Sequence, residues 1–140
     1  MNEVTDPRSP LRDFRRPALW VGIWVFGWIL CIVLSLIHPP RIDLHVPDGD
    51  KVGHFLAYGT LAAWSVMLFA RRRNHWLAAL ALVLLGIAME LAQGAFTSDR
   101  MMDSQDALAD ALGVLFAQLL VFTRGRFLLQ RIDGTAPSQS

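Results

Sequence analysis

The feature that most constrains this chain is a run of twenty residues without a charged side chain, from Ala18 to Ile37. As an α-helix rising about 1.5 Å per residue, this run would be about 30 Å long, which matches the core of a bilayer. A helix of a soluble bundle needs a polar outer face, and this run has none. A cleaved signal peptide is disfavoured, because the run is too long and no small-residue cleavage site follows it. We therefore expect a retained membrane span.

Three further apolar runs follow, and each is long enough for a membrane helix. A hydrophobic fraction of 54% and a charged fraction of 18% agree with a membrane protein. We expect an all-α fold, a four-transmembrane-helix bundle, with cytoplasmic tails over 1–17 and 124–140. The membrane domain would cover 18–123, with spans at about 18–37, 53–70, 76–96 and 106–123.

The distribution of basic residues predicts the orientation of these spans. The tail before the first run has four arginines, the segment 71–73 has three, and the tail after the fourth run has three. The other two loops hold only Arg41, Lys51 and Arg100. Because basic residues concentrate on the cytoplasmic side, both termini should be cytoplasmic, which agrees with an even number of spans.

Ionisable side chains at the ends of three spans fall at one depth. In this topology they lie within about 10 Å of the outer interface. An ionisable group at the centre of a span costs about 2.5–3.5 kcal/mol, so such a cluster indicates a functional site. The candidate ligand-binding residues are Asp50, Lys51, His54, Tyr58, Glu90, Gln93, Arg100, Asp103, Asp106 and Asp110.

The spacing of these residues places each set on one helical face. In the second span His54 and Tyr58 are four residues apart, and in the third Glu90 and Gln93 are three apart. At the fourth span, Asp103, Asp106 and Asp110 follow one another at three and four residues. Such faces should point inward, because lipid cannot satisfy their hydrogen bonds. Ala109, Gly113 and Ala117 form a row of small residues that would let the fourth helix approach a neighbour closely. A polar layer can serve only to lock helices together, but at least nine groups converge here, which favours a pocket.

The combined motifs resemble the VanZ-like family of bacterial membrane proteins over about Ala18 to Thr123. The motifs are Asp50-Lys51-x-x-His54-x-x-x-Tyr58, Glu90-x-x-Gln93 and Arg100-x-x-Asp103-x-x-Asp106-x-x-x-Asp110-x-x-Gly113. The family usually has Asn where this chain has Asp110, and a protonated Asp110 would imitate the amide as a donor. The resemblance implies a small multi-pass protein of the bacterial cytoplasmic (inner) membrane. The founding member is linked to low-level teicoplanin resistance, so a role in the cell envelope or in antibiotic response is expected.

Two classes of function remain open at this point. The first is a binding protein whose extracytoplasmic pocket recognises a polar ligand, a lipid headgroup, or a lipid-linked or glycopeptide-like molecule. Its partners would be that ligand and the lipid bilayer, with no nucleic acid. Lys51 and Arg100 would supply charge complementarity to the ligand. Transport of a proton or small solute is a further alternative.

The second class is a membrane-embedded enzyme acting on a lipid-linked phosphate or ester. Its candidate catalytic residues are His54, Glu90 and Asp106, with His54 or Glu90 as general base. Asp103 and Asp106 are candidate ligands for a divalent cation, and no other cofactor is expected. The sequence contains no GxSxG, HExxH or glycine-rich phosphate loop that would identify the reaction.

Overall fold

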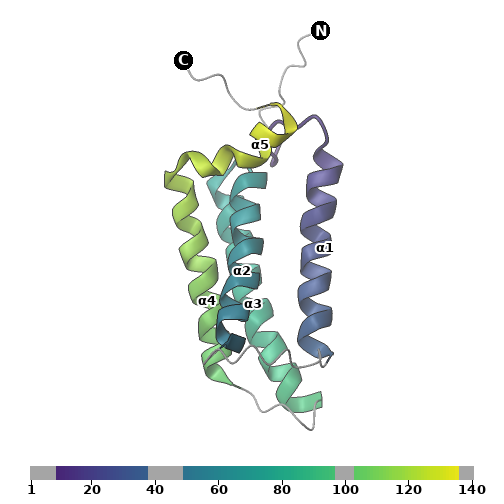
Figure 1. The fold of residues 1–140 in the computed structure, drawn as a ribbon, viewed down its shortest axis with the longest axis vertical. Helices are drawn as coiled ribbons and strands as arrows, with labels where there is room; N and C mark the ends of the chain where they lie inside the picture. Colours follow the sequence, from purple (N-terminus) through teal and green to yellow (C-terminus); the bar gives the residue numbers. More distant parts are fainter. Residues whose placement is uncertain (1–8, 38–48, 97–102, 136–140) are drawn as a thin grey trace.

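The computed structural model describes residues 9–37, 49–96 and 103–135, and over these ranges the protein is all-helical (Figure 1). One isolated antiparallel bridge joins Leu11 to Phe69, and the described residues contain no strand. The elements in chain order are α1 (Pro17–Leu36), α2 (Gly49–Leu68), α3 (Arg72–Phe96), α4 (Ser104–Gln118), the 3₁₀ helices η1 (Leu119–Phe122) and η2 (Arg124–Phe127), and α5 (Leu128–Asp133).

The helices extend beyond the apolar runs on which their prediction was based. Pro17 occupies the first turn of α1, where its fixed φ and missing N–H are no disadvantage. α2 and α3 each begin four residues before the apolar run, because polar residues flanking a run can continue the helix. The α-helical part of α4 ends at Gln118, and the chain then tightens into η1.

Three helical stretches are long and apolar enough to cross a membrane: Pro17–Leu36, Arg72–Ala95 and Ser104–Phe122. α1 buries only Trp20 and leaves large apolar side chains such as Phe26 and Ile29 exposed. Apolar exposure on this scale is unfavourable in water and is expected of a helix that faces lipid. α2 is not among the three, and its first half carries Asp50, Lys51 and His54.

α2 lies among the other long helices and packs most extensively against α4, with further contacts to α3 and α1. The core around it contains Tyr58, Leu61, Ala62, Ala79, Leu82, Val114 and Ala117. α2 and α4 approach most closely at Gly113, where an added Cβ would stand 2.3 Å from the backbone oxygen of Phe55. A glycine is therefore required at this contact, in agreement with the small-residue row predicted for the fourth span.

The sequence predicts a tail over 124–140, but the segment after η1 folds back as η2 and α5 over one end of the bundle (Figure 1). Leu129 is almost fully buried in a cluster with Trp20 and Leu68. The Asp133 carboxylate accepts hydrogen bonds from Trp20 Nε1 at 3.0 Å and from the backbone N–H of Arg15. Desolvation opposes these bonds, yet together they hold the pKa of Asp133 below its ordinary value.

Candidate functional site

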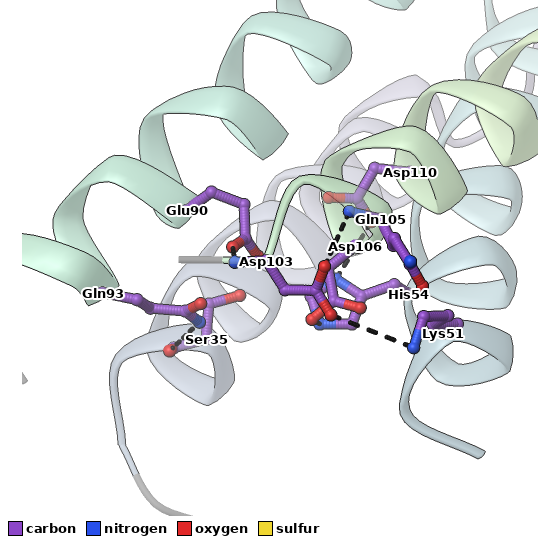
Figure 2. A network of polar contacts seen from close by, with 9 residues as sticks. All are labelled: Ser35, Lys51, His54, Glu90, Gln93, Asp103, Gln105, Asp106 and Asp110. Carbon is purple, nitrogen blue, oxygen red and sulfur yellow. Dashed lines mark hydrogen bonds and ion pairs between the residues drawn. The ribbon is translucent and has the colours of Figure 1, made fainter. Parts of the chain in front are cut away.

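The start of α2, the end of α3 and the start of α4 meet at the end of the bundle opposite α5 (Figure 1). We call the side chains gathered there the polar cluster, and Figure 2 shows most of them. Its described members are Asp50, Lys51, His54, Glu90, Asp103, Asp106 and Asp110. Arg100, which the sequence also placed here, lies outside the described residues.

Asp103 connects the three helices that build the cluster. Its Oδ1 caps α4 by accepting from the backbone N–H of Gln105 at 2.8 Å, and its Oδ2 lies 3.9 Å from Lys51 Nζ of α2. Its own backbone N–H donates to Oε2 of Glu90 on α3 at 3.0 Å. The capping position therefore fixes the start of α4 relative to both neighbours.

His54 lies between two carboxylates of α4 (Figure 2). Its Nδ1 is 3.1 Å from Oδ1 of Asp110, and its Nε2 is 3.8 Å from Oδ2 of Asp106. When Asp110 is ionised it only accepts hydrogen bonds, and the proton of this short contact then lies on Nδ1. Nε2 is then the ring nitrogen that faces Asp106.

The carboxylates of the cluster are buried to different depths. Asp110 is 1% exposed and packs against Gly86 of α3, where an added Cβ would stand 2.7 Å from its Oδ2. Glu90 is 3% exposed and Asp106 is 7% exposed. Among the described residues, neither Oε1 of Glu90 nor Oδ1 of Asp106 has a hydrogen-bond partner. A buried polar atom without a partner is unfavourable by about 1–3 kcal/mol, so these two oxygens require a donor or a cation from outside the described residues.

Two residues predicted for the pocket lie at its margin. Tyr58 is buried one turn further into the bundle, and its ring is nearly parallel to that of His54, with centroids 6.5 Å apart. Gln93 is turned toward α1, where its Nε2 donates to the backbone oxygen of Ser35 at 2.7 Å (Figure 2). Ser35 was not predicted, and no signal in the sequence would have found it, because its backbone carbonyl makes the contact.

The residues that could share a metal ion differ from the pair expected from sequence. Asp50, His54 and Asp106 each offer one ligand atom, and these atoms all lie within 4.8 Å of one another. Asp103 is instead directed toward Lys51 and its own helix cap. The three-residue spacing of Asp103 and Asp106 predicted a pair of metal ligands. Asp103 instead caps α4, and this role turns its carboxylate toward Gln105 and Lys51.

The charge of the cluster limits what it can bind. Five carboxylate side chains gather around one lysine and one histidine in the described part of the cluster. Carboxylates brought together in a region of low dielectric repel one another unless positive charge or hydrogen-bond donors lie between them. The cluster is therefore suited to a cation or to a ligand rich in donors.

An apolar groove lies between the two helices that carry most of the polar cluster, and its lining residues include none of the cluster. Phe55 and Leu56, which directly follow His54 on α2, line one end of a cavity of about 410 Å³ between α2 and α4. Thr60 and Phe116 line it further along, and Leu120 of η1 is also part of its wall. A polar end and an apolar groove thus share the same pair of helices.

No family model, curated protein or solved structure matches the chain. What the protein does must therefore be inferred from the chemistry of the polar cluster and of the groove beside it. The features that a function has to explain are two buried carboxylate oxygens without a partner among the described residues, the surplus of acids there, and the apolar cavity between α2 and α4.

Proposed function

We propose that this protein is a VanZ-like membrane protein that binds the polar part of an envelope amphiphile in the polar cluster. The observation that carries the proposal is the pair of buried oxygens, Glu90 Oε1 and Asp106 Oδ1, that lack a partner among the described residues. A cluster that served only to lock helices together would satisfy its own hydrogen bonds. Open acceptors at a junction of three helices are typical of a binding site.

Four membrane spans with cytoplasmic termini are part of this proposal. α2 is as long as α1, at 20 residues each, and is covered by α4, α3 and α1, so its polar side chains need not face lipid. Arg71 directly precedes α3 and Arg72 and Arg73 begin it, on the same end of the bundle as α5. Basic residues gathered at that end support a cytoplasmic location for it, which leaves the polar cluster on the extracytoplasmic side.

An amphiphile fits the arrangement better than a small polar solute does. The groove that starts at Phe55 and Leu56 can hold an acyl chain while the headgroup lies against His54 and Asp106. Apolar lining with a few polar groups at one end is the usual composition of a ligand site. The surplus of carboxylates requires positive charge or donors at the headgroup end.

The proposal is tested by identifying what stays bound to the protein. The full chain is purified from its native membrane in a mild detergent and then extracted with organic solvent. The recovered amphiphiles are compared by mass spectrometry with those of the bulk membrane. We expect one class of molecule to be enriched several-fold in the extract.

Two variants at the two ends of the site make this test specific. Glu90→Gln removes charge from the cluster but keeps an acceptor, and Thr60→Trp fills the groove from an exposed position. Both should abolish the enrichment. Asp13→Asn is the matched control, because it also removes an acid but lies at the opposite end of the bundle. An extract identical in composition to the bulk membrane for the wild type would refute the proposed function.

A further inference from the structure

We propose that Asp50, His54 and Asp106 bind one divalent ion of the transition series, which supplies the positive charge that the polar cluster needs. The inference rests on the proposed function, since it assigns a component of the same site. It rests on three independent observations: the distances between the three side chains, the orientation of the His54 ring, and an unsatisfied oxygen of Asp106.

The distances are close to those of a bound ion. Two ligand atoms bound at about 2.1 Å to a tetrahedral ion stand about 3.4 Å apart. His54 Nε2 and Asp106 Oδ2 are 3.8 Å apart, and the three ligand atoms, with Asp50 included, lie within 4.8 Å of one another. Small rotations of the side chains would close this gap. Asp50 is exposed at the first turn of α2.

Asp110 orients His54 as a metal ligand requires. Metal-binding histidines usually donate their second ring N–H to a carboxylate, which fixes the tautomer and the ring orientation. Nδ1 of His54 makes this contact with Asp110 Oδ1 at 3.1 Å. The lone pair of Nε2 is thereby directed toward Asp106. In a neutral His54 without a cation, this lone pair would face a carboxylate oxygen, so a metal ion or a second ring proton has to lie between them.

Asp106 provides an observation that does not depend on the clustering of acids. The residue is 7% exposed as a whole and its side chain 11%, and among the described residues its Oδ1 has no hydrogen-bond partner. An ion bound at Oδ2 would neutralise this buried carboxylate and leave Oδ1 to receive a donor from a second ligand. The headgroup of the proposed amphiphile would provide that donor.

The donor set selects the kind of ion. One imidazole nitrogen with two carboxylate oxygens suits Zn²⁺, Mn²⁺ or Co²⁺, whereas Mg²⁺ and Ca²⁺ prefer oxygen ligands alone. Three protein ligands also leave a coordination position open, as catalytic and ligand-binding sites do. The site should therefore discriminate strongly against Mg²⁺.

The test uses Co²⁺ as the probe, because its visible absorption reports its ligands. The full chain, purified without a polyhistidine tag and stripped of metal by a chelator, is titrated with Co²⁺ in detergent. We expect one Co²⁺ per chain with ligand-field bands in the visible range. Zn²⁺ should displace it, and a thousandfold excess of Mg²⁺ should not. A folded wild-type chain that binds no Co²⁺, or that releases it to Mg²⁺, overturns the proposal.

Variants then separate ligands from the orienting residue. His54→Ala should abolish Co²⁺ binding, and Asp50→Asn, at an exposed position, should weaken it at least tenfold. Asp110→Asn keeps all three ligands but loses the charged acceptor, so it should weaken binding about 10–100-fold. His75→Gln is the control, because His75 lies at the far end of α3 and donates only to the backbone oxygen of Phe69. Unchanged affinity in His54→Ala would show that the ion binds elsewhere.

The metal inference and the proposed function can be refuted separately. If the chelator-treated wild type still enriches the amphiphile but takes up no Co²⁺, the metal inference is wrong and the proposed function stands. If one Co²⁺ binds with the expected variant pattern while no amphiphile is enriched, the metal site stands and the proposed function is wrong.

Discussion

Glu90 has a structural role and a proposed binding role in the same carboxylate. Its Oε2 accepts the backbone N–H of Asp103 at 3.0 Å, while its Oε1 is buried without a partner among the described residues. Glu90→Ala should leave that N–H unsatisfied and lower the free energy of unfolding by about 1–3 kcal/mol. Glu90→Gln keeps an acceptor and should retain most of the stability while losing the bound amphiphile.

Thermal unfolding in detergent, followed by circular dichroism, measures the stability of these two variants. Asp13→Asn serves again as the control and should unfold like the wild type. Equal stability of Glu90→Ala and the wild type would show that the contact to Asp103 contributes nothing to the fold.

Asp133 makes the attachment of α5 dependent on pH. Its pKa is lower in the folded protein than the ordinary aspartate value of about 4, because Trp20 and Arg15 donate to the charged form despite some desolvation. A depressed pKa contributes stability above the unfolded value, and this stability is lost as the pH falls through the folded value. Asp133→Asn should therefore be less stable than the wild type at pH 7.

The difference between wild type and Asp133→Asn should shrink as the pH falls below about 4 and should vanish at still lower pH. Melting temperatures of both proteins across this range provide the measurement. A difference that stays constant with pH would mean that the charge of Asp133 does not hold α5.

Glu90 and Gln93 show which part of the site the sequence could predict and which part it could not. The spacing of Glu90 and Gln93 predicted one buried face, and both side chains are buried. Gln93 nevertheless reaches Ser35 on α1 instead of the cluster, since rotation within that face decides which neighbour is met. Helical spacing gives the face of a helix, but it does not give the identity of the packing partner.

At the scale of helices, the contact at Gly113 should be the most sensitive to a single methyl group. Gly113→Ala would place a Cβ 2.3 Å from the backbone oxygen of Phe55, and neither helix backbone can move away locally. We expect α2 and α4 to separate and the stability to fall by about 1–3 kcal/mol, measured by thermal unfolding.

Gly22→Ala is the control for this substitution. Gly22 is also inside a helix, but an added Cβ there meets nothing within 4 Å. This variant should be as stable as the wild type or slightly more so, because alanine favours a helix. If both variants behaved alike, the close approach of α2 and α4 would not matter for stability.

The long helices were predictable because each coincides with an apolar run, whereas α5 was not. α5 has only six residues, which is too short to be stable alone. It is held by the burial of Leu129 and by the bonds of Asp133 to Trp20 and Arg15. The bonds of Asp133 join positions more than a hundred residues apart, and no local sequence pattern predicts them.

At the scale of the whole molecule, the proposed topology places Gln105 and Arg73 on opposite sides of the membrane. Both side chains are exposed. In a Cys31→Ser background, Gln105→Cys should react with an impermeant maleimide added to intact cells. Arg73→Cys should react only after the membrane is permeabilised. The reverse pattern would contradict cytoplasmic termini and the extracytoplasmic location of the polar cluster.

The sequence predicted that the polar groups would meet at one end of the bundle, because each lies a similar distance from the end of its helix. A carboxylate or imidazole near the same end of each of three spans has to come to the same level whenever the spans are antiparallel neighbours. Which groups pair was not predictable, because Asp103 is turned aside by its capping role and Asp50 joins His54 and Asp106 instead.

The polar first half of α2 also bears on biogenesis. A helix that carries Asp50, Lys51 and His54 partitions poorly into lipid by itself, and only three residues separate its end from the start of α3. We expect the translocation machinery to release α2 and α3 into the bilayer together, as a single helical hairpin in which α2 packs against the apolar surface of α3. A nascent chain that stopped at residue 70 would then fail to retain α2 in the bilayer.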